Sequence, residues 1–385
     1  MSSNIDGIEG QRLWATLAGV VAAAAVYAIA QSLTYPLFAF ALERQGLDAW
    51  WIGLSAAMTP LGFIMSAPFI PMTARRFGMV QTAVACALLA SLMLGAMGAF
   101  QNYYVWLVLR FLLGCFANPL YVISETWLIA VTPAARRGRV LGAYSAIMSA
   151  GFAFGPLTLS IMGSQGWAPY LVGIAGFLVA GAILFASAAH APPADTESEV
   201  VSVGSFFRLA PFLLFAVAAV AAMEHALFSM TAVYGLAFGS SEARISAIIA
   251  TLSIGNLLLQ IPLGRLAERF GAMPMMMTCA LLTVAGAALF PFVFSGWAMW
   301  PLAVIWGATI FGIYTMALVA LGDRFTGRML MVGNAAFALV WGAGGIAGAP
   351  SAGFVMKWVG PNGLPLWIAL LAGAVAVFLL VSRRR

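Results

Sequence analysis

Apolar runs of about 20 residues recur along the whole chain. Their length indicates whether the chain folds in water or in a lipid bilayer. A helix of that length crosses roughly 30 Å of hydrocarbon. Charged residues make up only 8% of the sequence and hydrophobic residues 63%, whereas a soluble domain carries about a quarter charged residues. Water cannot be the solvent for most of this surface, and we predict an all-α membrane protein.

The apolar runs predict twelve transmembrane helices. We expect them to cover residues 14–42, 49–72, 79–100, 103–131, 140–163, 167–189, 209–236, 244–265, 273–295, 298–321, 329–356 and 363–382. The segment before the first run has no basic region followed by a short apolar core and a small-residue cleavage site. We therefore expect the first helix to be kept rather than removed as a signal peptide.

Two short stretches repeat each other about half a chain length apart. Ala74-Arg75-Arg76-Phe77-Gly78 corresponds to Ala267-Glu268-Arg269-Phe270-Gly271, an offset of 193 residues from Arg76 to Arg269. The stretch from Gly151 to Pro156 corresponds at almost the same offset to the stretch from Gly345 to Pro350. An apolar chain that repeats itself once at half-length is typical of a duplicated membrane bundle.

One long polar stretch, Ala191 to Gly204, separates the sixth predicted span from the seventh. Its Pro, Asp, Glu and Ser residues are typical of a mobile linker. We therefore predict an N-terminal six-helix bundle over residues 1–190, a cytoplasmic linker over 191–207 and a C-terminal six-helix bundle over 208–385.

The distribution of basic residues predicts the orientation. With both termini in the cytoplasm, all but four of the 18 Lys and Arg residues fall on the cytoplasmic side. The exceptions are Arg44, Arg244 and Lys357 on the outer side, and Arg110 inside a span. This bias follows the positive-inside rule, so we expect a multi-pass protein with both termini in the cytoplasm. The net charge of +6 therefore reflects membrane topology, and we expect no nucleic-acid partner.

Three motifs resemble those of the major facilitator superfamily, and the resemblance covers all twelve spans. The stretch from Gly264 to Gly271 resembles the superfamily's glycine–acid–arginine–glycine loop, and Arg110 to Gly114 resembles its arginine motif. Gly151 to Pro156 resembles the Gly-Pro motif, which the superfamily associates with antiporters. Glu125-Thr126-Trp127 followed by Arg137 to Leu141 is similar to a bacterial branch of the YcaD type.

The resemblance implies two pseudo-symmetric six-helix bundles that alternate in access around a central site. It assigns conformational roles to Gly151, Gly155, Pro156, Gly264, Glu268, Arg269 and Gly271. The first-half loop departs from the family pattern, with Pro71 where glycine is usual and Arg75 where an acid is usual. A charge latch is therefore expected only in the second half, where Glu268 supplies the acid.

Four ionisable residues lie well inside the predicted spans: Arg110, Glu125, Glu224 and His225. A charge at the bilayer centre costs at least about 2.5 kcal/mol, so these groups should face a wet cavity or a partner. Arg110 and Glu125 are about 22 Å apart along one helix and cannot pair. Glu224, near the middle of the seventh span, is the better partner for Arg110. A permanent Arg110–Glu224 ion pair and a switching one both stay open.

We predict that Glu224 binds and releases the coupling proton, because a carboxyl group in low-dielectric surroundings resists ionisation. His225 either assists that transfer or bonds to a neighbouring helix, since it points about 100° away from Glu224. Glu125 is either a second proton site or a structural partner of the basic loop at residues 136–139.

In the family that this chain resembles, spans one, four, seven and ten line the cavity. On span four, Arg110, Asn118, Tyr121 and Glu125 fall within about 80° of one another, and Asn256 and Gln260 are one turn apart on span eight. The predicted substrate-binding residues are Arg110, Tyr27, Gln31, Tyr35, Asn118, Tyr121, Asn256, Gln260 and Tyr314.

These features predict a secondary transporter that moves a small, partly apolar organic solute, with or without an anionic group, by proton-coupled efflux. Two alternatives stay open: a proton-coupled importer of an organic anion, and a non-transporting receptor or assembly factor on a transporter scaffold. A clustered nucleophile and base, metal-ligand spacing and a P-loop are all missing from the sequence, so we predict no enzyme, no metal and no cofactor. The expected partners are the solute, protons and the lipid bilayer, and we expect a monomer.

Overall fold

The computed structural model describes residues 2–132, 137–188, 204 and 206–382. In this part of the chain, all regular structure is helical, and twelve helices are long and apolar enough to cross a membrane. These twelve are α1 (Ser2–Arg44), α2 (Ala49–Ser66), α4 (Met79–Ala99), α5 (Tyr103–Val131), α6 (Arg137–Met162), α7 (Ala168–Ala186), α9 (Pro211–Ala237), α10 (Glu242–Phe270), α11 (Ala272–Val293), α12 (Met299–Arg324), α13 (Gly327–Val359) and α14 (Gly363–Ser382). The predicted all-α membrane fold is confirmed.

Two short helices complete the described chain: α3 (Phe69–Phe77) and α8 (Phe206–Leu209). The prediction that the second span continues to residue 72 is wrong, because α2 ends at Ser66 and α3 begins separately. The cause is local. Pro68, at the N-cap of α3, has no N–H to donate and restricts the residue before it.

The chain forms two compact units. Unit 1 comprises Met1–Thr34, Leu61–Gly155 and Gln165–Ser198, and unit 2 comprises Tyr35–Pro60, Pro156–Ser164 and Glu199–Arg385. Three helices, α1, α2 and α6, pass from one unit to the other. The predicted domain boundary at residues 191–207 stays a prediction, and residues 189–203 of the predicted linker lie outside the described residues.

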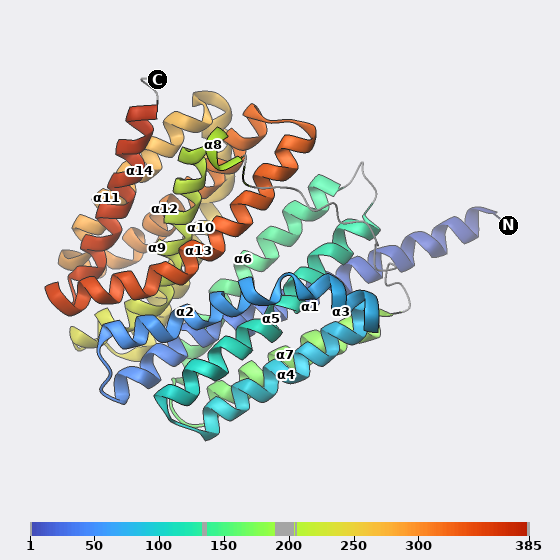
Figure 1. The fold of residues 1–385 in the computed structure, drawn as a ribbon, viewed down its shortest axis with the longest axis horizontal. Coiled ribbons are helices and arrows are strands. Elements are labelled where there is room, and N and C mark those ends of the chain that lie inside the picture. The colour runs from blue at the N-terminus through green and yellow to red at the C-terminus, as the bar shows by residue number, and fades with distance from the viewer. Residues whose placement is uncertain (1, 133–136, 189–203, 205, 383–385) are drawn as a thin grey trace. The chain divides into compact units, whose positions relative to one another are not determined.

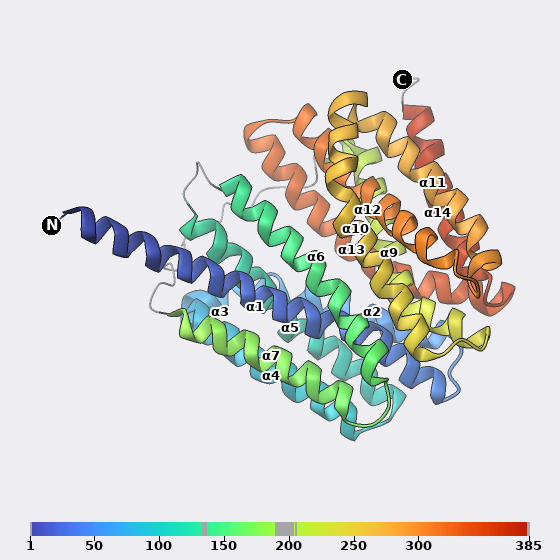
Figure 2. The ribbon, with the colours of Figure 1, turned by 180° about the vertical axis from the view of Figure 1, so that it is seen from behind.

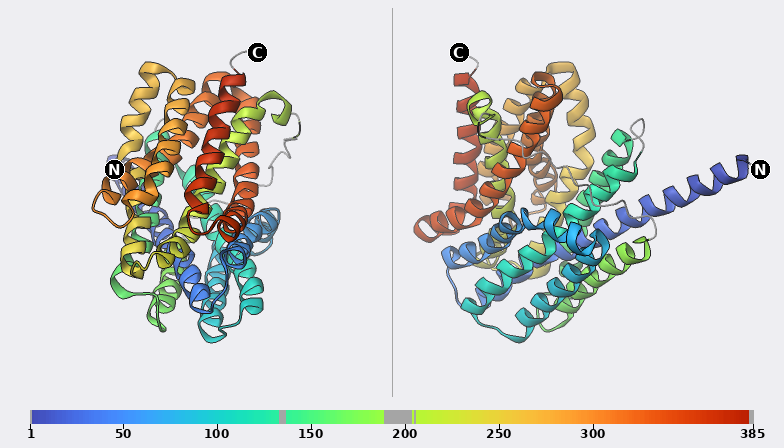
Figure 3. Two further views of the ribbon diagram at one scale, coloured as in Figure 1. Left: turned by 90° about the vertical axis from the view of Figure 1, so that its left-hand side faces the viewer. Right: turned by 45° about the vertical axis from the view of Figure 1, so that its right-hand side comes forward.

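Each unit is held by helices that lie side by side. In unit 1, α4 packs against α5 and α7 (Figures 1 and 2). In unit 2, α9 packs against α13 and α14, and Figure 3 shows the yellow-green α9 beside the red α14. Helices α10 and α11 both pack on α12. These helix pairs position the side chains considered below.

The half-length repeat is visible in backbone geometry. Gly78 and Gly271 adopt nearly the same dihedral angles, with φ of 92° and 89° and ψ of 149° and 150°. Each ends one helix and begins the next, at a positive φ that side chains rarely tolerate. Before each glycine, an arginine lies over the neighbouring phenylalanine ring, at 5.4 Å for Arg76 and 5.3 Å for Arg269. The repeated sequence therefore encodes a repeated turn.

Glycines also bring two pairs of helices into close contact. A Cβ added at Gly151 or Gly155 of α6 would lie 2.9 Å or less from backbone or side-chain atoms of α1. A Cβ added at Gly344 or Gly348 of α13 would lie 2.2 Å from carbonyl oxygens of α9. Both pairs are again 193 residues apart. The structure thus shifts the second motif by one residue, because Gly344 and not Gly345 takes the place of Gly151.

Candidate functional site

Polar side chains follow one face of α5. This helix starts at the Asn102 cap, whose side chain accepts hydrogen bonds from the N–H groups of Tyr104 and Val105. Arg110, two turns further along, is only 1% exposed. Asn118 is also buried, whereas Tyr121 and Glu125 are partly exposed. At 100° per residue these four side chains share one face, as predicted.

Asn118 holds α2 where that helix ends. Its amide nitrogen donates hydrogen bonds to the Phe63 carbonyl oxygen at 2.9 Å and to the Ser66 hydroxyl at 3.1 Å. A buried amide with both bonds made contributes to helix packing. The contacts therefore favour a structural role for this predicted substrate ligand.

An aromatic cluster lies in the second half of α5, beyond Asn118. The rings of Tyr27 and Tyr121 stack with centroids 6.4 Å apart, and Phe177 of α7 meets Tyr27 edge-on at 6.1 Å. Tyr121 also hydrogen-bonds to Glu125, one turn further along. Gln31 is buried on the same helix as Tyr27. Unit 1 thus brings together an apolar aromatic surface and a carboxyl group.

Unit 2 contains the other two ionisable residues that lie inside predicted spans, Glu224 and His225 of α9. The His225 Nδ1 lies 2.9 Å from the Ala221 carbonyl oxygen. Since a carbonyl only accepts, Nδ1 carries a proton, and in the neutral ring Nε2 is an acceptor. Tyr35 meets the imidazole edge-on at 6.0 Å, and a Cβ added at Gly345 would lie 3.0 Å from Nε2. His225 is partly buried, with neighbours close to both ring nitrogens.

Glu224 differs from its neighbour. Its Oε2 atom is buried and makes no hydrogen bond to any described residue. A buried carboxylate oxygen in that state is costly unless the group is protonated or solvated. The Thr231 hydroxyl of α9 is also buried without a described partner, but Glu224 is the one of the two that can change its charge.

A chain of hydrogen bonds joins α10 and α12. The Thr315 hydroxyl donates to Gln260 Oε1, and Gln260 Nε2 donates to Asn256 Oδ1, both at 2.5 Å. Beside it, the Tyr314 ring packs on Trp341 with centroids 4.8 Å apart. The structure thus joins Asn256, Gln260 and Thr315 by hydrogen bonds, and it pairs Tyr314 with Trp341. The role of Asn256, Gln260 and Tyr314 in substrate binding stays a prediction.

The sequence prediction missed a cluster formed by Arg44, Ser164 and Glu242, called the end cluster below. Arg44 forms an ion pair with Glu242 and donates to the Ser164 hydroxyl at 2.6 Å and to its carbonyl oxygen at 3.1 Å. The Ser164 hydroxyl in turn donates to Glu242 at 2.5 Å. All three residues belong to unit 2. The sequence did contain one signal for this cluster. Arg44 follows the first predicted span and Glu242 precedes the eighth, so two opposite charges lie on the same predicted outer side of the membrane.

A second ion pair in the same unit joins Asp48, just before α2, to Lys357 near the end of α13, with 3.0 Å between Oδ2 and Nζ. Partial burial acts to raise the Asp48 pKa, but the hydrogen bonds from Lys357 and from the Trp51 N–H outweigh it, so this pKa lies below its ordinary value. The pair therefore persists at neutral pH.

Metal ligation has no visible basis in these sites. Within residues 2–132, 137–188 and 206–382, His, Cys, Asp and Glu side chains nowhere gather in groups of three that could hold an ion.

Comparisons with known proteins agree with this architecture. The chain is 25% identical to the uncharacterized MFS-type transporter YfkF of Bacillus subtilis (strain 168), over 92% of each chain. It is 23% identical to the uncharacterized MFS-type transporter YcaD of Salmonella heidelberg (strain SL476), over 89% of this chain and 88% of that one. The predicted similarity to the YcaD type is confirmed.

Solved structures share the fold at low sequence identity. A variant of the nucleoside transporter NupG superposes with a TM-score of 0.80 and 13% identity, covering 95% of this chain and 99% of that chain. A bacterial homolog of the human lysosomal transporter Spinster, in an inward-facing and unoccupied conformation, gives a TM-score of 0.70 with 17% identity over 96% and 95%.

The family model of the Major Facilitator Superfamily matches residues 20–237 and 213–385, which together span nearly the whole chain. Twelve apolar helices, a repeat at half-length and MFS-type relatives all lead to one assignment. This chain belongs to the major facilitator superfamily and is a multi-pass membrane transporter, not an enzyme.

Proposed function

We propose that this transporter couples the movement of protons to the efflux of a small, partly apolar organic anion across a bacterial inner membrane. Glu224 carries the proton. The observation that supports this role is its buried Oε2 atom, which makes no hydrogen bond to a described residue in the middle of α9. A carboxyl group can change charge by one proton without any other cofactor, so it suits a coupling site.

Glu125 and His225 are secondary candidates for proton transfer. Glu125 already bonds to Tyr121, and the Nδ1 atom of His225 already bonds to Ala221. These hydrogen bonds fix the orientation of both side chains, whereas no described partner fixes the Oε2 atom of Glu224. We therefore assign coupling to Glu224 and positioning roles to the other two.

The substrate proposal rests on the chemistry of unit 1. Arg110 offers a buried guanidinium group, which suits a carboxylate or phosphate. Tyr27 and Tyr121 offer stacked rings for an apolar part of the solute. Import of the same organic anion uses the same groups, so the direction is a separate question for the experiment below.

Our proposal for alternating access rests on the three helices that contribute residues to both units. The division falls between Thr34 and Tyr35 in α1, after Pro60 in α2 and before Pro156 in α6. Each helix thus has a proline within two residues of its division point, at Pro36, Pro60 and Pro156. Proline removes a backbone hydrogen bond and allows a helix to bend. We propose that these prolines are the bending points.

We expect the end cluster to hold together the ends of α1, α6 and α10 that it connects. Replacing Arg44 by alanine removes the ion pair with Glu242 and two hydrogen bonds to Ser164. An ion pair at an exposed position typically contributes about 0.2–1 kcal/mol. We expect thiol labelling of a cysteine at Ala49, buried against Gly353 of α13, to rise about 1.4- to 5-fold. The background lacks Cys86, Cys115 and Cys279.

The matched control for this experiment is Arg244→Ala. Arg244 also lies at the start of α10, but it donates to the carbonyl oxygens of Phe294 and Gly296 and not to the end cluster. Its removal should leave labelling at position 49 unchanged. Equal labelling in the Arg44 variant and the parent would contradict a closing role.

The transport proposal itself is tested on the purified protein. Thermal-shift screening of organic acids and neutral analogues identifies binders, and counterflow in proteoliposomes at two pH values then tests movement. We expect an anionic solute to exchange, and a pH gradient to drive it out of vesicles in the efflux orientation. A folded protein that moves none of its binders would favour the receptor or assembly role.

A further inference from the structure

The short helix α3 (Phe69–Phe77) has an unusual outward face. Only Ile70 and Ala74 of this helix are buried. Phe69 is 55% exposed and Met72 56%, and both Arg75 and Arg76 are exposed. α3 lies between the spans α2 and α4, and it packs on α4 (Figure 1). Large apolar side chains and cations are therefore presented together where two spans end.

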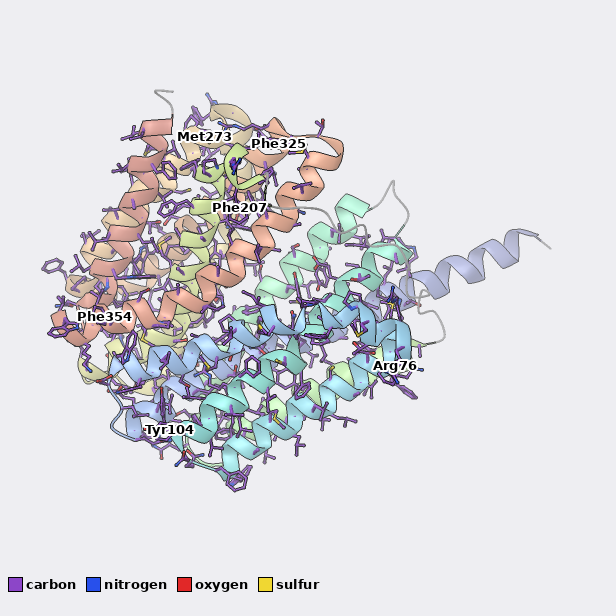
Figure 4. The ribbon with its side chains drawn as sticks, viewed as in Figure 1. Arg76, Tyr104, Phe207, Met273, Phe325 and Phe354 are labelled. Carbon is purple, nitrogen blue, oxygen red and sulfur yellow. The ribbon has the colours of Figure 1, made fainter. Side chains whose placement is uncertain are left out.

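The spacing places these side chains on one continuous surface. At 100° per residue, Phe69, Met72 and Arg76 fall within about 60°, and Arg75 lies about 60° further round. Ile70 and Ala74 point to the opposite side, toward the bundle. Figure 4 shows Arg76 at the surface, at the end of this helix. Neither arginine forms an ion pair with a described residue.

Neither water nor hydrocarbon alone suits such a face. Exposing phenylalanine and methionine to water is unfavourable, and placing two arginines in hydrocarbon is costly. The plane between lipid headgroups and acyl chains accepts both kinds of side chain, and amphipathic helices that bind there have this composition.

The second repeat lacks this arrangement. At the position that matches Arg75, 193 residues later, it has Glu268, so Arg269 has an acid beside it. The matching residues also continue α10 without a break and form no separate helix. The two adjacent cations and the short helix are therefore specific to the first repeat, although the following turn is the same in both.

We propose that α3 is a binding site for the headgroups of anionic phospholipids in the surrounding membrane. Arg75 and Arg76 donate to the phosphate oxygens, because guanidinium groups match that geometry. Phe69 and Met72 insert beside the first carbons of the acyl chains. The site includes neither Arg110 nor Glu224, so it does not depend on the transport proposal.

The test uses the full-length protein in detergent micelles with either phosphatidylglycerol or phosphatidylcholine added. We expect native mass spectrometry to show retention of phosphatidylglycerol over phosphatidylcholine. The Arg75→Ala/Arg76→Ala variant should lose about fivefold in apparent affinity per arginine. Phe69→Ser/Met72→Ser should weaken the binding of both lipids, because it removes the apolar contact that they share.

The matched control is Arg265→Ala/Arg269→Ala, which removes two exposed arginines from the corresponding end of α10. It should retain the preference for phosphatidylglycerol. If this variant loses as much phosphatidylglycerol binding as the Arg75/Arg76 variant, the attraction is diffuse and the proposal is overturned. If inorganic phosphate displaces the lipid, the site binds anions from the water phase, and the proposal is also overturned. If Arg75→Ala/Arg76→Ala does not fold, Arg75→Gln/Arg76→Gln removes the same two charges. Unchanged retention of phosphatidylglycerol in whichever of these two variants folds would also overturn the proposal.

Discussion

Replacing Glu224 by glutamine should reduce pH-driven transport by at least tenfold while leaving counterflow of the solute nearly intact. Glutamine keeps the size of the side chain but cannot release a proton at any relevant pH. The parent protein should therefore show a counterflow rate that depends on pH, and the Glu224→Gln variant a rate that does not. Proteoliposomes with and without an imposed pH gradient measure both quantities.

Glu125→Gln is the matched control, because it removes the other carboxyl group that lies within a predicted span. We expect it to retain pH-driven transport, since Glu125 bonds to Tyr121. Undiminished pH-driven transport in the Glu224 variant would remove this residue from coupling. A loss in the Glu125 variant alone would transfer the role to that residue.

Replacing Gly155 of α6 by leucine should strongly destabilise the protein. Even a Cβ at this position would lie 2.1 Å from the Ser32 hydroxyl and 2.6 Å from the Ile29 carbonyl oxygen of α1. The hydroxyl can rotate away, but the backbone cannot. Overpacking of this kind typically costs about 1–3 kcal/mol, and the rest of the leucine side chain adds to it. Thermal unfolding in detergent measures the loss.

Gly142→Ala is the control on the same helix, because a Cβ at Gly142 meets nothing within 4 Å. It should be neutral or slightly stabilising, since alanine favours helix by about 1 kcal/mol over glycine. Gly348→Leu in α13 should behave like Gly155→Leu, because its Cβ would lie 2.2 Å from the Ala222 carbonyl oxygen. A Gly155 variant as stable as the parent would contradict the close packing of α1 and α6.

Much of the fold was predictable because its signals are local. The predicted span 103–131 coincides with α5, where the apolar run begins after a capping asparagine. The prediction failed at the second span because hydropathy continues through Pro68, whereas the helix does not. The repeated turns at Gly78 and Gly271 were recognisable as a sequence repeat, because a positive φ restricts the residue at one position.

The candidate site was predictable only in part. Residues on one helix face, such as Arg110, Asn118 and Tyr121, follow from the helical period. The partner of Asn118 does not, because Phe63 and Ser66 reach it only through the way α2 packs. The end cluster was missed for the same reason, since Arg44 and Glu242 are 198 residues apart.

The sequence by itself determined the solvent, the number of spans and the duplication, because hydrophobic length and repeated turn residues act within a few turns of chain. Tertiary structure alone decided which polar groups meet and which glycines face a neighbouring helix. Gly344 faces the backbone of α9 and Gly345 faces the His225 ring of the same helix, because a shift of one residue rotates a side chain by about 100°. Helix packing determines which face of α13 meets α9, and a short stretch of sequence does not specify that packing.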